Sequence, residues 1–231
     1  SIHEYRRRQN RGIVADFDPA GFDPAASFCR VGPGSLGGKG RGLAFISFLL
    51  EEYAVESRFP GVQIGVPPAI VLGAEVFDRV LDDNQLRDAA LGSTDDARMF
   101  EQFLKAAFPG EVWRDLMEFL EIARYPLAVR SSSLLEDSPY QPFAGIYDTC
   151  MVSNSHADPR VRLTRLREAI CRVYASTFSQ RAKSYLKTSP YRLEEEKMAV
   201  VIQKVAGLTR GGRHYPDLAG VARSHNFYPA A

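Results

Sequence analysis

The chain has 231 residues, of which 45% are hydrophobic and 25% charged, as expected of a soluble globular protein with one large domain or two small ones. Its formal net charge of +1 argues against a broad basic surface for nucleic acid, and no apolar run approaches the ~20 residues that span a bilayer. The three cysteines form no CxxC pair, so we expect buried, reduced thiols in a cytoplasmic protein rather than a zinc site.

The predicted elements begin after an irregular amino-terminal segment. Turn residues recur at 16–19 and 21–24, so residues 1–30 are expected to lack regular structure. A glycine-rich turn at 32–40 then leads into a helix over about 41–56. Apolar residues at helical spacing predict that this helix has one buried face, formed by Leu43, Ile46, Leu49 and Leu50.

The remaining elements form a mixed α and β pattern without a low-complexity linker. Apolar residues keep three-and-four spacing from Leu163 to Tyr185, which predicts one long helix. A basic turn at 210–214 is expected to be a solvated hairpin. In chain order we expect a strand at 66–72, helices at about 74–82, 95–107 and 110–123, strands at 126–131 and 146–152 joined by a loop at 132–145, the long helix at about 158–186, and strands at 198–206 and 218–222.

An arginine at the end of an apolar strand is the most informative feature. Burying the Arg130 guanidinium there is costly without an anionic partner, and its planar fork of donors suits phosphate oxygens. The alternative is an internal ion pair with Glu136 or Asp137. The serines at 131–133 belong to the phosphate site on this interpretation, but they could equally be turn residues, because serine is common in turns. The side chains of Glu136 and Asp137 point apart on an extended segment, so we expect them to hold the loop that carries Gly145 rather than a metal.

A glycine-rich turn carries Lys39 just before the first predicted helix. The letters from Gly32 to Gly37 match GxGxxG, but a Walker loop needs Ser or Thr after its lysine, where this chain has Gly40. A lysine on its flexible stem can reach a phosphate from such a turn. The alternative is a turn that caps the helix and leaves Lys39 in solvent.

A glutamine interrupts the apolar strand at 198–206. Gln203 must find hydrogen-bond partners there, and adenine supplies them because it needs an acceptor for its amino group and a donor for a ring nitrogen. Neighbouring backbone would satisfy the glutamine as well, so Gln203 alone does not identify an adenine site.

Three segments, taken in order, resemble the nucleotide-binding domain of the phosphoenolpyruvate synthase and pyruvate phosphate dikinase family. They are the glycine–lysine turn and helix start at 37–44, the arginine strand and glycine loop at 129–149, and the strand at 198–205. Residues 178–185 and 220–221 resemble the family too. These enzymes use an ATP-grasp domain. The resemblance therefore implies an α+β, ATP-grasp-like domain over residues 31–231, with mixed sheets and flanking helices, truncated on its carboxyl-terminal side.

The resemblance also implies a role for each matching residue. Lys39 and Arg130 would contact the ATP phosphates and act in phosphoryl transfer, and Gly145 with its neighbours would form a loop over the triphosphate. Gln203 to Val205 would line the adenine site. The implied nucleotide-binding residues are Lys39, Arg130, Ser131, Gly145, Thr149, Gln203, Lys204 and Val205.

The implied reaction moves phosphate from ATP to a histidine on another domain and then to pyruvate. The family's Mg²⁺ ligands and its phosphohistidine are expected beyond this chain, so the phosphohistidine and pyruvate-binding domains would be partners. The histidines present, which lack the family's threonine–histidine context, are His3, His156, His214 and His225. Two alternatives stay open: a related dikinase that phosphorylates an antibiotic or a glucan, and a non-catalytic nucleotide-sensing module.

Overall fold

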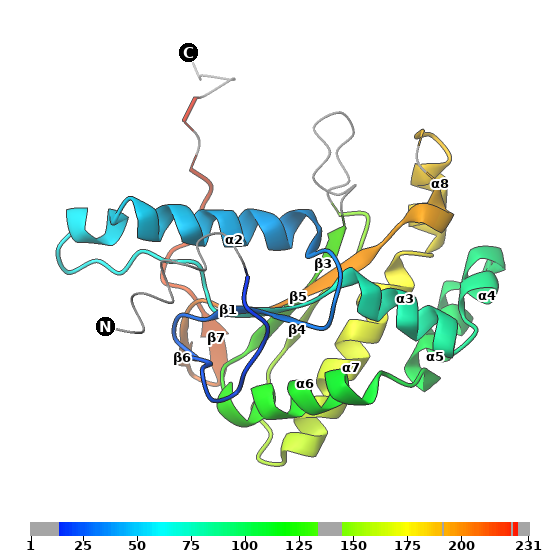
Figure 1. The fold of residues 1–231 in the computed structure, drawn as a ribbon, viewed down its shortest axis with the longest axis horizontal. Helices are drawn as coiled ribbons and strands as arrows, with labels where there is room; N and C mark the ends of the chain where they lie inside the picture. Colours follow the sequence, from blue (N-terminus) through cyan, green and yellow to red (C-terminus); the bar gives the residue numbers. More distant parts are fainter. Residues whose placement is uncertain (1–13, 134–144, 191, 223, 226–231) are drawn as a thin grey trace.

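A five-stranded mixed sheet forms the centre of the computed structural model, which describes residues 14–133, 145–190, 192–222 and 224–225 (Figure 1). The first pair of strands is parallel and the other neighbours are antiparallel. Across the sheet the strands are β1 (Phe28–Val31), β2 (Ala69–Leu72), β5 (Met198–Lys204), β3 (Leu127–Ser133) and β4 (Thr149–Val152).

Helices lie on both sides of this sheet. The helix α2 (Gly37–Glu52) lies across one face, and α6 (Gly110–Ile122) and α7 (Pro159–Ser176) lie under the other (Figure 1). A two-stranded hairpin of β6 (Leu208–Arg210) and β7 (Arg213–Tyr215) follows the sheet. The other elements are α3 (Ala74–Asp83), α4 (Arg87–Gly92), α5 (Asp96–Lys105), α8 (Gln180–Leu186) and the short 3-10 turns η1 (Val55–Arg58) and η2 (Leu193–Glu195).

The two faces of the sheet are covered unequally. On the face that we call the core face, strand residues such as Ile70, Val129 and Ile202 join a large cluster with aromatic side chains of the helices. On the opposite face, which we call the α2 face, the buried cluster is small and consists of Ala69, Val71, Ala199 and Val201. Successive strand side chains alternate between faces, so neighbours in sequence meet these two environments in turn. The thin cover leaves part of the α2 face accessible.

The predicted mixed α and β organisation is confirmed, with differences at several boundaries. The helix expected at 41–56 begins at Gly37 and ends at Glu52. Residues 28–30 belong to β1, although they were expected to be irregular, because β2 supplies a parallel partner that the local pattern does not reveal. The strand at 126–131 extends to Ser133, so the serines are not turn residues. The helix α4 was not predicted.

The long helix predicted at 158–186 is wrong as a single element. It is two helices, α7 and α8, because Ser179 begins a new helix by accepting a hydrogen bond from the Ala182 N–H at 3.2 Å. The strand predicted at 218–222 is also wrong. Leu218 and Val221 are 92% and 84% exposed. A strand needs a neighbour to pair with, and the described residues place none beside this segment.

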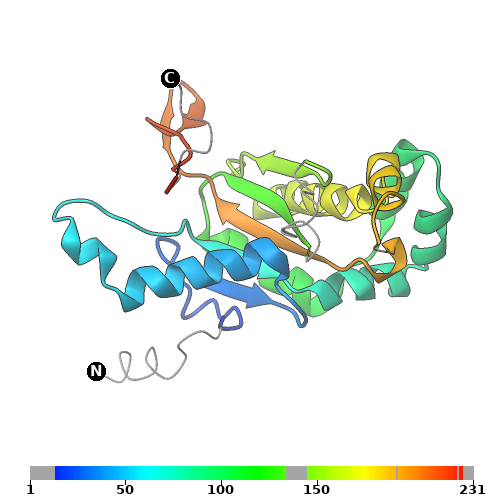
Figure 2. The same cartoon turned by 90° about the horizontal axis from the view of Figure 1, so that it is seen from above.

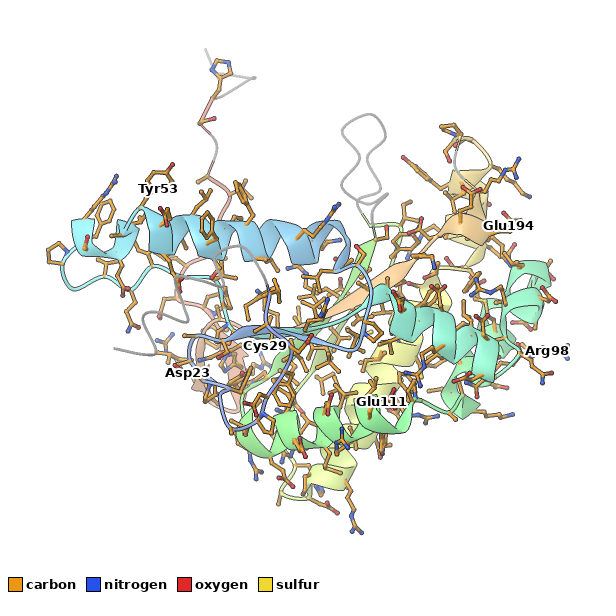
Figure 3. All side chains as sticks on the ribbon, in the orientation of Figure 1. Asp23, Cys29, Tyr53, Arg98, Glu111 and Glu194 are labelled. Atoms are coloured by element: carbon orange, nitrogen blue, oxygen red, sulfur yellow. The ribbon has the colours of Figure 1, made fainter. Side chains whose placement is uncertain are left out.

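The buried face predicted for α2 forms only in part, because Leu43, Leu49 and Leu50 are half-buried and Ile46 is exposed. The buried residues of this helix are Gly37 and Gly40, whereas Phe45 is 60% and Ile46 48% exposed. Figure 2 shows that the carboxyl half of α2 extends past the sheet, and Figure 3 shows Tyr53 on its outer side. Helical spacing of apolar residues therefore produces only partial burial here, because the sheet ends before the helix does. No described helix is long and apolar enough to cross a membrane.

Candidate functional site

Arg130 and Gln203 lie side by side on the α2 face. They come from the neighbouring strands β3 and β5, in which Gln203 is opposite Ala128 and Arg130 is opposite Val201. The Nη1 atom of Arg130 donates to Oε1 of Gln203 at 3.5 Å, and Nε2 of Gln203 donates to the Pro67 carbonyl at 3.2 Å. Both ends of the glutamine side chain are thus engaged by the protein. Gln203 orients Arg130 and ties it to the segment that enters β2.

The three serines after Arg130 divide between the two faces. Ser131 and Ser133 are opposite Val200 and Met198, which belong to the core face, and both serines are buried. Ser132 is the serine that shares the α2 face with Arg130. The structure therefore does not bring Ser131 to Arg130. The alternation of a strand would have predicted this division if the strand had been extended through the serines.

The glycine turn places Lys39 in the first turn of α2, against β3. Gly37 has a φ of +68°, and a Cβ built on it would lie 1.7 Å from the Ser132 carbonyl oxygen, so the two backbones are in close contact. The Nζ atom of Lys39 is buried. The interpretation of Lys39 as a solvated residue is therefore wrong. The strand β1 ends at Val31, so this turn connects a strand to a helix, which the sequence did not indicate.

Thr149 extends the same face on the far side of Arg130. The two residues are direct partners in the β3–β4 ladder, so their side chains share a face. Thr149 is exposed, and Met151, which is 71% exposed, is opposite Ala128. This part of the α2 face is therefore open to a ligand.

Gly145 begins a turn that leads into β4. It is exposed, with a φ of +78° and nothing within 4 Å of a Cβ built on it. The turn is held from α8: Arg181 donates to the Ile146 carbonyl and to Asp148 Oδ1, each at 2.9 Å. The Asp148 N–H donates to Ser176 Oγ at 3.0 Å. The break between α7 and α8 thus provides two anchors for the turn.

Some of the residues that carry the resemblance cannot be placed. Glu136, Asp137, Phe143 and Ala144 lie outside the described residues. The predicted ion pair between Arg130 and Glu136 or Asp137 and the loop over the triphosphate therefore stay predictions.

In the residues that follow Gln203, some backbone groups have hydrogen-bond partners in the neighbouring strands and one carbonyl has none there. The Lys204 N–H donates to the Pro68 carbonyl at 2.9 Å, but Pro68 has no N–H with which to bind the Lys204 carbonyl in return. The Val205 N–H donates to the Pro126 carbonyl at 2.9 Å. The Val205 carbonyl lies 3.1 Å from Nε2 of His214, on β7. The Lys204 carbonyl is therefore an acceptor that the strand pairing does not use.

The Lys204 side chain points away from Arg130. Its Nζ lies 5.0 Å from the centre of the Tyr125 ring, a cation–π contact on the core side of the strand. Burial raises the pKa of the Tyr125 phenol to about 12, so it is neutral beside the lysine at ordinary pH. Lys204 therefore offers a ligand its backbone rather than its ammonium group.

A cavity of about 1000 Å³ reaches this strand end from the side of α2. It is bordered by the carboxyl half of α2, by residues 63–68, and by Lys204, Ala206 and Gly207. Neither Lys39 nor Arg130 lines it. The predicted adenine end, at Lys204, and the predicted phosphate end, at Lys39 and Arg130, are thus different regions along β3 and β5.

The described side chains favour the binding of an anion over covalent or metal chemistry of their own. Burial raises the pKa of Cys29 to about 11 and that of Cys171 to about 12, and it also raises the pKa of Cys150. These thiols are free, Cys171 is buried and the other two are half-buried, and all stay protonated near neutral pH. Within the described ranges no group of His, Cys, Asp or Glu side chains fits a metal ion. Lys39, Arg130 and the amino end of α2 instead make a cationic corner.

The comparison with protein families agrees with this geometry. The family model for the AMP/ATP-binding domain of pyruvate phosphate dikinase matches residues 34–230, which include every site residue discussed above. Because this match covers most of the chain, the protein belongs to the pyruvate phosphate dikinase AMP/ATP-binding domain family. The search of curated proteins found no match to this chain.

Proposed function

We propose that the chain binds ATP in an ATP-grasp-type site and forms the nucleotide-binding part of a phosphoenolpyruvate synthase-like phosphotransferase. The observation that carries the proposal is the convergence of Arg130, Thr149 and the Lys39 turn on one thinly covered sheet face. Family membership supports the use of ATP.

The phosphates bind at the end of the site formed by Lys39 and Arg130. Arg130 supplies a planar fork, Lys39 a point charge, and the first N–H groups of α2 the positive end of a helix dipole. Thr149 adds a hydroxyl beside Arg130, and the turn that begins at Gly145 leads into the same strand. A polyphosphate is the ligand that matches several fixed positive groups on one face.

The adenine binds at the end of the site formed by residues 204–206. The Lys204 carbonyl can accept from the adenine amino group, since Pro68 leaves it without a ladder donor. In extended backbone, residues 204 and 206 direct their polar groups to the same edge, so the Ala206 N–H can donate to a ring nitrogen. Ala206 is exposed and borders the cavity. In this proposal the Gln203 side chain supports Arg130, and the backbone beyond it contacts the base.

The chemistry is in-line phosphoryl transfer, in which the chain's residues act by positioning and by neutralising charge. The acceptor is a histidine of a further domain, which then phosphorylates pyruvate in the cytoplasm. Mg²⁺ would accompany ATP, but the described residues do not fit it, so we assign no step of the reaction to a metal. A dikinase with an antibiotic or glucan acceptor, or a nucleotide sensor without catalysis, uses the same site.

Titration of the full-length protein with ATP, followed by transfer assays with labelled ATP and pyruvate, tests the proposal. We expect saturable binding and label in phosphoenolpyruvate. In a crystal with bound nucleotide, the adenine should lie against residues 204–206. Ordered adenine at another place would contradict the assignment of the base, and saturable binding without any transfer would favour the sensor.

A further inference from the structure

The hydroxyl of Ser132 lies inside the first turn of α2, although it belongs to another element. Ser132 is fully buried on β3. Its Oγ accepts from the Gly40 N–H at 2.9 Å and donates to the Leu36 carbonyl at 2.7 Å. Leu36 and Gly40 are four residues apart, the spacing at which these two groups bind each other in an ordinary helix. The first turn of α2 is therefore closed through a side chain of the sheet.

This contact attaches the amino end of α2 to the sheet. The two buried residues of the helix are Gly37 and Gly40, and both lie against Ser132. The N-cap residue, Leu36, has a side chain that makes no capping hydrogen bond. Because glycines have no side chain to pack, the hydrogen bonds of Ser132 and the backbone contact at Gly37 help to fix this turn, together with Leu36, which packs against the small buried cluster of the α2 face.

The same contact links the two cationic residues of the proposed site. Lys39 lies between Leu36 and Gly40, and Ser132 is two residues beyond Arg130 on the same strand face. The placement of Lys39 relative to Arg130 therefore depends on how the first turn of α2 is fixed to β3. We propose that Ser132 is a positioning residue, which holds Lys39 at a set place relative to Arg130 so that both contact one polyphosphate. This inference rests on the proposed function.

Removing the hydroxyl should move the turn without unfolding the domain. In Ser132→Ala the freed Gly40 N–H and Leu36 carbonyl can bind each other directly, so neither stays unsatisfied. That closure tightens the helical turn and shifts Lys39. Ser133→Ala is a matched control, since Ser133 is the next residue on the same strand, is equally buried and lies on the core face.

The decisive experiment is a double-mutant cycle on ATP affinity in the full-length protein. The variants are Ser132→Ala, Lys39→Met and the two combined, with Kd measured by isothermal titration. If Ser132 acts through Lys39, Ser132→Ala should raise Kd roughly tenfold in the wild-type background and less than about twofold in the Lys39→Met background. Ser133→Ala should leave Kd unchanged, even where it lowers Tm.

Other outcomes separate this inference from the proposed function. An equal rise of Kd in both backgrounds would mean that Ser132 acts independently of Lys39 and would overturn the inference alone. An absence of ATP binding by the wild type would overturn the proposed function and the inference with it. If Ser132→Ala does not fold, Ser132→Cys takes its place in the cycle, because a thiol of similar size bonds weakly and keeps the space filled.

Discussion

Arg130 and Arg162 carry the same guanidinium into different surroundings. Arg130 is half-buried on the α2 face, where its Nη1 donates to Oε1 of Gln203. Arg162 is fully buried and donates to the carbonyls of Leu120 and Ala123, at the carboxyl end of α6. Burial lowers the pKa of Arg162 from its ordinary value, but a guanidinium stays charged at neutral pH. In the proposed site Arg130 contacts a ligand, whereas Arg162 completes a helix end.

The substitution Arg130→Lys should keep the fold and lose most of the phosphotransfer activity. Lysine keeps the charge but not the bidentate fork, and one lost charge-assisted contact to a transferring phosphoryl group costs ~2–4 kcal/mol of the barrier, roughly a hundredfold or more in rate. Turnover and Tm should be measured on one sample. The control is Arg167→Lys, because Arg167 binds the carbonyls of Leu104 and Ala106 on the helical side and should affect Tm alone. Near-normal turnover with a lower Tm in Arg130→Lys would assign that residue a structural role.

The substitution Arg162→Met should lower the free energy of unfolding by about 1–3 kcal/mol, because the Leu120 carbonyl loses a buried donor. ATP affinity should not change, since Arg162 lies on the core side. Urea unfolding measures the loss. Arg160→Met, an exposed site on the same helix, should stay within about 0.5 kcal/mol of the wild type. Equal effects at both sites would show that the buried hydrogen bonds of Arg162 contribute little.

At the scale of elements, the adenine end of the proposed site depends on one hydrogen bond that the pairing of β2 and β5 lacks. The Lys204 carbonyl has no N–H opposite it on β2, so it is left to accept from a ligand. The antiparallel ladder of β2 and β5 would ordinarily continue to residue 68, but proline supplies no N–H there. The strand end therefore keeps its pairing on the β3 side and an open acceptor on the β2 side. A central strand can in this way present backbone to a ligand without fraying.

The substitution Pro68→Ala should weaken ATP binding several-fold. The new N–H would pair with the Lys204 carbonyl and compete with the adenine amino group for it. Pro67→Ala is the matched control: it removes the same ring constraint, but its N–H points to the opposite edge of the strand. Kd for ATP measured on both variants checks this prediction. Equal Kd values for the two variants would show that the Lys204 carbonyl does not bind the adenine.

At the scale of the whole molecule, the core buries groups that must stay uncharged. Burial raises the pKa of Cys29 to about 11 and those of Cys171 and Tyr125 to about 12 in the folded protein, whereas the ordinary values are lower by two or three units. The folded state therefore resists deprotonation. Stability that depends on these groups is fully present below the unfolded pKa values and is lost as the pH rises through the folded ones.

We accordingly expect the free energy of unfolding to be level near neutral pH and to fall progressively from about pH 9 to pH 12. Urea unfolding at a series of pH values measures this. The variant Cys171→Ala should show a shallower fall, because it removes one of the groups whose pKa differs most between the two states. A slope identical to that of the wild type would show that Cys171 ionises equally easily in both.

Much of the secondary structure and the family could be predicted from local sequence. The apolar runs at β2, β3 and β5 and the periodic helices α3, α5, α6 and α7 follow from spacing, which is a property of each segment alone. The arginine strand, the glycine–lysine turn and the glutamine strand identified the family that the comparison confirms. Their order along the chain carries that information, and no contact between them is needed to read it.

The tertiary structure decided which side chains share a surface. The sequence could not predict that β1 pairs with β2, that α2 extends past the sheet with Phe45 and Ile46 exposed, or that the helix at 158–186 breaks at a capping serine. It also could not show that Pro68 faces Lys204, and the division of Ser131 from Ser132 follows from alternation only once the strand is known to extend through the serines. These features depend on register and on close contact between segments far apart in the chain. Local spacing determines the type of an element, but its partners determine which face and which backbone groups remain for function.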